Sequence, residues 1–406
     1  AKRRSADLLW VCRSDKGVRP RTAITLWQSL VRPLLEYAAE LWSGQIPADL
    51  ARQAESVQMT FLRGTLGLHA NGSGAADDNI RAEVGCEKLA DRWSKLRLGY
   101  WRRIFSSPAT RLLRVVAAFR HGECMAPGQY GTRGWMPSAR STLQTAGLDR
   151  YWQEPPAAAD CAGGQWREIA YTAVEETSDT DRHAHMSAGR GTSAYLPLKE
   201  WGRNTTEYAF SSGEEGRLGY RVPERYLDDR QDLKGTRLKL LSRLLCLPLM
   251  DRAGREARPQ WPKHNRVCMA CDEGIVEDVQ HFVMHCPSYA EKRATLMHDV
   301  AGVLATSNGT VGAEDFIAMP SQDQKHILLG RRVGDPAAEN RIDRATKRFL
   351  RKAWNARERA GLSTRIVNAV CGTAFSDSPP ACNRGSMQGA GSVVAGAPLV
   401  TGPVLP

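Results

Sequence analysis

The sequence has few features of secreted or membrane proteins. No apolar run approaches the roughly 20 residues that a membrane-spanning helix needs, and no signal peptide opens the chain. Ten cysteines among 406 residues, three of them in one cluster, do not fit a secreted disulfide scaffold. These absences predict an intracellular protein, nuclear or cytoplasmic, that lives in a reducing compartment and has no membrane partner.

The last part of the chain is almost free of charge. Residues 376–406 contain one acid and one base among Gly, Ala, Ser, Pro and Val. Such a segment buries too little apolar surface to fold, so we predict a disordered tail over residues 371–406. At the other end the chain begins Ala-Lys-Arg-Arg without an initiator Met, and we expect it to be a piece of a longer protein.

Acidic residues are outnumbered by basic ones. Lys and Arg total 56 against 44 Asp and Glu, which gives a formal net charge of +12 and a pI near 9.3. This excess favours a polyanionic partner, and RNA or DNA is the commonest. The alternative is that the charge only keeps the protein soluble.

Four candidate metal ligands lie within nineteen residues: Cys268, Cys271, His281 and Cys286. A Cys-x2-Cys pair on a tight turn provides two thiolates, and a His and a Cys five positions apart can complete a tetrahedron. Soft sulfur with one imidazole suits Zn²⁺, and four protein ligands indicate a structural site. His285 is a rival third ligand, although it adjoins Cys286. The remaining alternative is a set of unligated cysteines under a basic surface.

Apolar residues recur at helical spacing in most of the remaining chain, which predicts a mainly α fold. Pro33 interrupts the first of these stretches, so we expect a kink or two abutting helices there. The predicted helices cover Thr22–Trp42, Pro47–Leu66, Leu89–Phe105, Leu233–Leu249, Tyr289–Val303 and Asp343–Gly361. Residues 126–230 are rich in Gly, Pro, Ser and Thr and predict an irregular connection with a short helix through Trp166–Glu175.

Basic side chains are predicted on the outer faces of two of these helices and beside the Cys/His cluster. In the Leu89–Phe105 helix, Tyr100 and Trp101 interleave with arginines, which favours nucleic-acid contact. The candidates for phosphate contacts are Arg92, Lys95, Arg102 and Arg103, and separately Lys263, Arg266, Lys347, Arg351 and Lys352.

Two groups of residues together resemble one protein family. The first comprises Leu30-Val31-Arg32-Pro33-Leu34-Leu35-Glu36-Tyr37-Ala38, Trp42, Val57-Gln58, Phe61-Leu62-Arg63, Leu66-Gly67 and Glu83-Val84-Gly85. The second comprises Arg266-Val267-Cys268, Glu277-Asp278, His281-Phe282, Cys286-Pro287, Tyr289, Arg293, Phe349-Leu350, Trp354 and Arg357. Both resemble the C-terminal part of non-LTR (LINE-type) retrotransposon reverse transcriptases, over roughly residues 1–125 and 230–360.

The resemblance implies a helical thumb over residues 1–125 that grips template and primer. It further implies a CCHC zinc knuckle with flanking helices over 231–300 and a basic helical region over 301–370. The palm and fingers, with their Mg²⁺-binding aspartates, and the endonuclease region would lie outside this chain. On this reading the chain binds RNA or DNA during target-primed reverse transcription but is inactive alone.

Three other groups of residues imitate functional sites. Tyr226-Leu227-Asp228-Asp229 spells a polymerase motif, but its neighbours do not read as the apolar strands of a catalytic hairpin. Asp315 and Asp323 are residue types of a metal-dependent nuclease and also lack strands around them. Asp179, Asp181, His183 and His185 are interpreted as a polar surface loop. The sequence also lacks a Walker-type loop and a nucleophile elbow.

Three hypotheses follow from the sequence. The first is the nucleic-acid-binding portion of a reverse transcriptase without its palm. The second is an enzyme, which would require the Asp228–Asp229 pair or the Asp323 region to be catalytic. The third is a host-adapted or remnant helical interaction protein whose zinc site is purely structural.

Overall fold

The structure, a computed structural model, describes residues 1–12, 18–68, 75–125, 134–156, 163–189, 192–199, 219–229, 231–257 and 259–362. The predicted disordered tail over 371–406 lies outside the described residues. In the described ranges the mainly helical prediction is confirmed, and no β-strand is present apart from an isolated antiparallel bridge between Val267 and Val276. None of the helices in these ranges is both long enough and apolar enough to cross a membrane.

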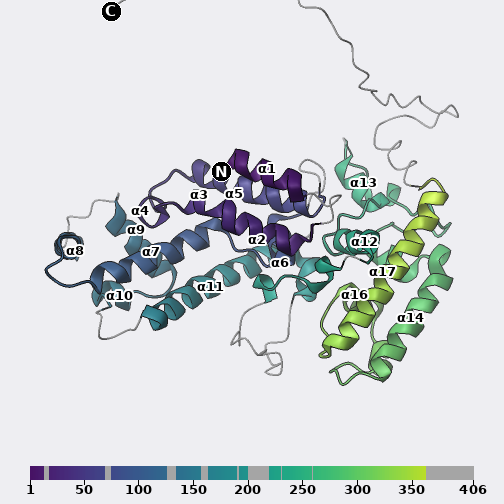
Figure 1. The fold of residues 1–406 in the computed structure, drawn as a ribbon. Coiled ribbons are helices and arrows are strands. Elements are labelled where there is room, and N and C mark those ends of the chain that lie inside the picture. Colours follow the sequence, from purple (N-terminus) through teal and green to yellow (C-terminus); the bar gives the residue numbers. More distant parts are fainter. Residues whose placement is uncertain are drawn as a thin grey trace, which may run out of the picture.

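The elements follow the chain as a series of helices of very different lengths (Figure 1). They are α1 (Lys2–Cys12), α2 (Pro20–Leu30), α3 (Arg32–Glu36), α4 (Ala39–Trp42), α5 (Ala48–Thr65), α6 (Asp77–Val84), α7 (Leu89–Phe105), α8 (Leu112–Met125), α9 (Trp135–Thr145), α10 (Arg150–Gln153), α11 (Gly163–Ala188), α12 (Leu233–Arg243), α13 (Met250–Glu256), α14 (Ala290–Ala305), α15 (Ala313–Ala318), α16 (Ser321–Leu329) and α17 (Pro336–Arg359).

The first helical stretch is broken where the sequence predicts it. Helix α2 ends at Leu30, and α3 begins at Arg32 with Pro33 in its first turn. Proline has no N–H to donate and is tolerated only at the start of a helix, so the chain turns before it. The break lets α2 and α5 share a core, in which the rings of Trp27 and Phe61 lie 6.1 Å apart.

The middle of the chain is more helical than the sequence analysis predicts. Helix α11 runs for 26 residues along α7, where a short helix to Glu175 is expected. Every fourth residue of α11 is buried, but the apolar pattern breaks at Ser178 and Arg182. A reading of hydrophobic periodicity therefore stops too early. The residues at this spacing are Trp166, Ala170, Val174, Ser178, Arg182 and Met186, and Asp179 is buried beside them.

Two large hydrophobic cores, with a small third cluster around Met250 and Ala253, hold the described helices together. The smaller core surrounds Trp101, which stacks on Trp152 with ring centroids 5.2 Å apart, and joins α7 to α9, α10 and α11. The larger core is one contiguous cluster in space, and its members come from positions between Cys12 and Trp354 of the sequence. It therefore crosses the boundaries predicted at residues 125, 230 and 300.

A buried ion network connects the N-terminal helices to the C-terminal ones. Arg243 on α12 donates from Nε to Glu83 on α6 over 2.6 Å, and both side chains are fully buried. The Tyr226 hydroxyl donates to the other Glu83 oxygen over 2.8 Å. Glu224 lies 3.1 Å from Arg243 and 2.6 Å from the buried Lys199. Each charge in this network thus has a partner from a distant part of the sequence.

We predict that Arg243→Met lowers the free energy of unfolding by about 3–5 kcal/mol, because Glu83 would remain as a buried carboxylate without a cation. Lys234→Met is the matched control, since the Lys234–Glu358 pair is nearly half exposed and spans 2.8 Å. Exposed pairs contribute at most about 1 kcal/mol. Urea denaturation of both variants measures the difference, and equal losses would contradict the role of the network.

Acid should weaken the same network. Burial alone raises the pKa of Glu224, but the charges of Arg243 and Lys199 outweigh burial and hold the pKa below its ordinary value of 4.5. The stabilisation that Glu224 contributes is therefore complete above about pH 4.5 and is lost as the pH falls further. We expect the stability gap between the wild-type protein and Glu224→Gln to shrink as the pH falls from about 4.5 toward the folded-state pKa of about 2. A gap that stays constant would show that Glu224 ionises as in the unfolded chain.

Candidate metal centre

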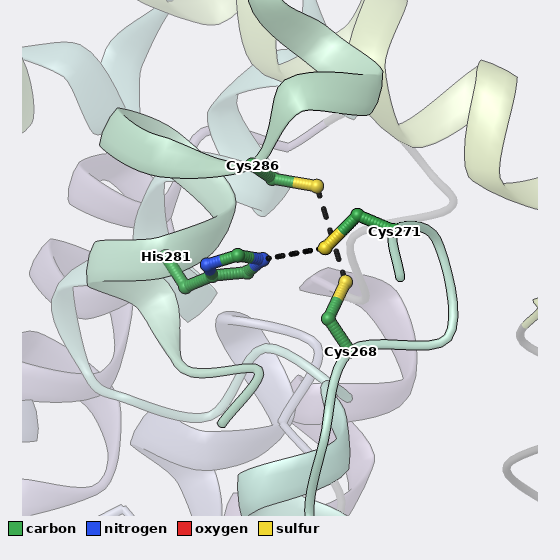
Figure 2. Close-up of side chains that lie close together, drawn as sticks. All are labelled: Cys268, Cys271, His281 and Cys286. Carbon is green, nitrogen blue, oxygen red and sulfur yellow. Dashed lines mark hydrogen bonds between the residues drawn. The ribbon is translucent and has the colours of Figure 1, made fainter. Parts of the chain in front are cut away.

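Cys268, Cys271, His281 and Cys286 converge on one point (Figure 2). Their ligand atoms all lie within 4.8 Å of one another. The Cys268 and Cys286 sulfurs are 3.9 Å apart, and Cys271 Sγ lies 3.4 Å from His281 Nε2. A tetrahedral zinc site with Zn–S bonds of about 2.3 Å has sulfur–sulfur edges of about 3.8 Å. The four residues can therefore hold a metal ion such as zinc.

Local hydrogen bonds shape both halves of the cluster. The loop that carries Cys268 and Cys271 is closed by a bond from Cys268 N–H to the Ile275 carbonyl over 2.8 Å. The second half is a π-helical turn, His281–His285, whose first N–H donates to the Asp278 carboxylate over 2.8 Å. The turn ends when Cys286 N–H donates to the His281 carbonyl. These bonds aim His281 and Cys286 at the loop.

His285, the rival ligand, lies outside the cluster. It is exposed, and its Nε2 lies 3.2 Å from both Gln280 and Ser321. His281 is buried instead, and burial lowers the pKa of its ring so that the neutral imidazole, the form that binds metals, is favoured. Its Nδ1 has no hydrogen-bond partner among the described residues.

Protons compete with a metal for the thiols. The hydrogen bond with Cys286, followed by burial, raises the pKa of Cys268, whereas the same hydrogen bond lowers the pKa of Cys286. Burial raises the pKa of Cys271. Because thiolates are the ligands, metal binding must release these protons and should tighten as the pH rises.

The cluster is fixed to the C-terminal helices by a buried ion pair. Glu277, which precedes the π-helical turn, pairs with Arg357 of α17 through both carboxylate oxygens, one of them over 2.9 Å. The Cys268 thiol lies 3.5 Å from the same carboxylate. Arg293 of α14 donates to the Cys286 carbonyl over 3.0 Å. The cluster is therefore part of the folded core, in which Arg357 is fully buried.

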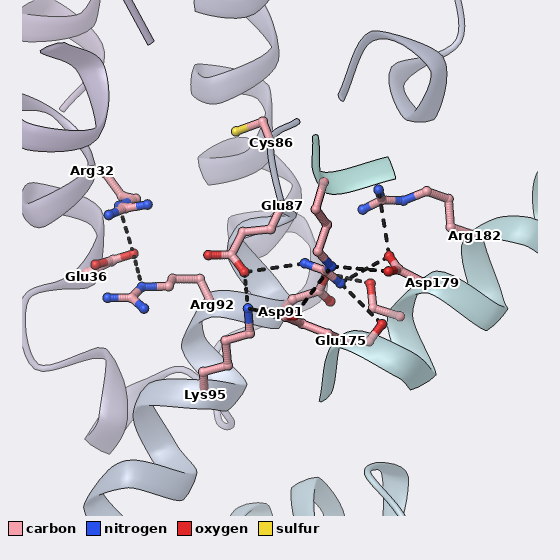
Figure 3. A network of polar contacts seen from close by, with 12 residues as sticks. Arg32, Glu36, Cys86, Glu87, Asp91, Arg92, Lys95, Glu175, Asp179 and Arg182 are labelled. Carbon is pink, nitrogen blue, oxygen red and sulfur yellow. Dashed lines mark hydrogen bonds and ion pairs between the residues drawn. The ribbon is translucent and has the colours of Figure 1, made fainter. Parts of the chain in front are cut away.

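Two of the basic residues predicted on the α7 surface serve internal ion pairs (Figure 3). The expectation that Lys95 faces outward is wrong: its side chain is 4% exposed and lies between Glu87 and Glu175, the latter at 2.7 Å. Arg92 is half-buried and bonds to Glu36 over 3.1 Å. The acids that hold Lys95 come from the loop before α7 and from α11, where Glu175 is the last residue of the predicted short helix.

The C-terminal end of α7 carries a more exposed basic side chain than its middle does. The side chain of Arg103 is 67% exposed and lies 4.7 Å from the Tyr100 ring centre, whereas Arg102 is half-buried. Trp101, expected among the surface arginines, is fully buried.

The second predicted group of phosphate-binding residues contains both buried and exposed side chains. Lys347, expected on an outer face, is 1% exposed and lies 2.7 Å from Asp343 and 3.0 Å from Asp229. Arg266 is half-buried and donates to the Trp261 carbonyl, and Arg351 pairs with Asp232 over 3.2 Å. Lys263 and Lys352 are exposed, as predicted.

An exposed row of basic residues on α17 extends beyond the predicted set. It recurs every three or four positions and comprises Arg341, Arg344, Arg348 and Lys352, here called the α17 stripe. The helix predicted over Asp343–Gly361 lacks the first turns of α17, which begins at Pro336. The sequence does contain a helix-start pattern here, Asp335 followed by Pro336. In the structure Asp335 caps the helix by accepting from Ala337 N–H, and Pro336 is its first residue.

The three groups that imitate functional sites lie in helical segments. Arg225–Asp228 is a 3₁₀ turn, and Asp229 pairs with Lys347, so the motif forms no catalytic hairpin. Asp315 accepts from Gly312 N–H at the start of α15, and Asp323 lies in the first turn of α16. The residues from Asp179 to His185 belong to α11, so their interpretation as a loop is wrong.

We predict that freshly purified protein carries one equivalent of Zn²⁺ and that Cys271→Ser or His281→Ala abolishes stoichiometric binding, because each removes one of four ligands. His285→Ala is the matched control and should retain the metal. Native mass spectrometry and competition with a chromogenic chelator provide the measurement. Metal-free wild-type protein that takes up no zinc would overturn the site, and loss of zinc in His285→Ala would reassign the third ligand.

The chain was compared with protein-family models, with curated proteins and with solved structures, and none of them matches it significantly.

Proposed function

We propose that this chain is a nucleic-acid-binding portion of a non-LTR retrotransposon reverse transcriptase, stabilised by a structural Zn²⁺. The observation that carries the proposal is the juxtaposition of the Cys₃His cluster and the α17 stripe. Helix α17 binds the cluster through buried Arg357 and exposes basic residues on its other side. The family resemblance rests in part on this same segment.

The zinc would act by folding the protein and not by catalysis. Three thiolates and one imidazole fill a tetrahedral ion, so no position remains for water or substrate. Besides its cysteines, the loop from Cys268 to Gly274 contributes only Met269 and Ala270 to apolar packing. Metal binding would thus hold the loop on the face formed by α14 and α17, beside the basic surface.

The α17 stripe suits the phosphate backbone and carries no base-reading geometry. Its residues are spaced over eleven positions of one helix, which is about 16 Å at 1.5 Å per residue. Arginine guanidinium groups bind phosphate oxygens in pairs, and such contacts supply affinity without sequence preference. Arg348 is also 3.4 Å from Asp299, an exposed pair that a phosphate can replace. We therefore expect binding that depends strongly on salt.

A helical interaction protein is the second candidate, and helix α8 favours it. This helix exposes Leu112, Val115, Val116 and Phe119 at helical spacing, with exposed fractions between 49% and 76%. Only Ala117 of α8 is buried. An apolar helix face of this kind is typical of a protein–protein contact.

The salt dependence of binding tests the first candidate. For single-stranded RNA, log affinity should fall linearly with log salt by about 0.7 per phosphate contact. Arg344→Glu should weaken binding at low salt and flatten this slope by about one contact. Arg52→Glu, an equal change of charge at an exposed position of α5, is the matched control and should leave the slope unchanged.

Fluorescence anisotropy with single-stranded RNA, single-stranded DNA and duplex measures these slopes. Equal effects of the two variants would mean that the net charge, and not the α17 stripe, binds the nucleic acid. No binding to any of the three at low salt would leave the interaction protein as the better candidate.

A further inference from the structure

A polar cavity of about 460 Å³ lies between α7, α9 and α11, and none of its lining residues belongs to the metal centre. Its size is within the range of about 300–1,000 Å³ that small-molecule sites occupy. All three helices present hydroxyl groups to it, and on α9 these recur at helical spacing. These residues are Ser94 on α7, Ser138, Ser141, Thr142 and Thr145 on α9, and Thr177 and Ser178 on α11.

Among the described residues, Arg97 is the one cation that lines this cavity, and no carboxylate pairs with it. The residue is 7% exposed. Its guanidinium donates to two hydroxyls, Thr142 Oγ1 and, over 2.6 Å, Ser43 Oγ. No carboxylate of the described residues lies within 4.0 Å of the Arg97 guanidinium, the distance that defines an ion pair. Lys95, two positions earlier, contacts two carboxylates. A guanidinium is always charged, and burying it without a counter-charge costs free energy. An anion bound beside Arg97 would offset this cost.

The chain also approaches Arg97 more closely than a side chain would allow. A Cβ added to Gly44 would lie 3.0 Å from Arg97 Cζ and would collide with Ser138. Ser138 in turn donates to the Gly44 carbonyl over 3.1 Å. Gly44 therefore lets the segment after α4 close over one side of the guanidinium and form a wall of the cavity.

Hydrogen-bonding capacity remains unused on the other walls. The hydroxyls of Ser94, Ser141 and Thr145 make no hydrogen bond within the part of the chain that the structure describes, so they are free to donate. Asp91 lies six residues before Arg97 on α7, about 9 Å along the helix, and accepts from Ser178 over 2.5 Å. Asp181 is an exposed carboxylate at the same cavity. The cavity thus has a cationic end and an end that accepts hydrogen bonds.

We propose that this cavity binds a phosphate ester of a sugar, with the phosphate on Arg97 and the sugar hydroxyls toward Asp91 and Asp181. A planar guanidinium binds two phosphate oxygens at once, and free hydroxyls from Ser94 and Ser141 can donate to the others. A neutral sugar would leave Arg97 unbalanced, and inorganic phosphate would leave the carboxylate end empty. The ligand source is a free sugar phosphate or the phosphorylated end of a nucleic-acid strand. The inference does not depend on the function proposed above.

Calorimetric titration of the full chain with ribose 5-phosphate tests the inference, with ribose and inorganic phosphate as comparisons. We expect ribose 5-phosphate to bind at least tenfold more tightly than either. Arg97→Gln should weaken its binding at least tenfold, and Arg103→Gln, at an exposed arginine of the same helix, should not. Absence of binding by ribose 5-phosphate, or equal affinity for ribose, would overturn the proposal.

A second pair of variants leaves the buried guanidinium in place. Ser141→Asp puts a negative charge into the cavity from an exposed position and should weaken ribose 5-phosphate binding at least tenfold. Gln144→Asp adds the same charge to the same helix outside the cavity, and equal affinities of the two variants would also overturn the proposal.

Competition with oligonucleotides distinguishes the two sources of the ligand. A 5′-phosphorylated strand that displaces ribose 5-phosphate, where its 5′-hydroxyl counterpart does not, identifies a strand end as the ligand. Failure of the phosphorylated strand to compete identifies the free sugar phosphate.

Discussion

The fold depends on buried cations that are neutralised by carboxylates from distant parts of the chain. Arg243 with Glu83 joins α12 to α6 across 160 positions of the sequence, and Arg357 with Glu277 joins α17 to the segment before the π-helical turn across 80 positions. A buried charge without its partner is far more costly than an exposed one, so each pair specifies one arrangement of the helices that contribute it. The hydrophobic cores favour compactness, and the ion pairs select which helices meet.

This use of charge changes what the net charge of +12 means for function. Lys95 and Lys347 look like surface residues in the sequence because their helices are otherwise amphipathic. Both are inside the protein, where they neutralise acids such as Glu175 and Asp229. The surface that can attract a polyanion is therefore narrower than the composition implies, and it includes the α17 stripe.

The sequence predicted the features that depend on local spacing and missed those that depend on distant partners. The ligand set of the Cys/His cluster and the break at Pro33 follow from a few neighbouring residues. The sequence favoured His281 over His285 because His285 adjoins Cys286, and the π-helical turn accordingly directs His285 toward Ser321. The length of α11 was missed because the polar residues Ser178 and Arg182 occupy buried positions, where Ser178 bonds to Asp91 of α7 and Arg182 lies over the Tyr220 ring. The sequence did not indicate a site at Arg97, because the lack of a carboxylate partner can be recognised only when the spatial neighbours of the residue are known.

Several of the residues that carry the family resemblance make contacts inside the fold. Glu83 holds Arg243, Arg293 holds the Cys286 carbonyl, and Arg357 holds Glu277. Gly85 has a φ of +65°, and a Cβ there would lie 2.6 Å from the Arg221 carbonyl oxygen, so the position favours glycine. These residues support the architecture and the metal site, and none of them is an exposed phosphate-binding residue. The resemblance is therefore an argument about how the chain folds, whereas nucleic-acid binding must be argued from the exposed charges of α17.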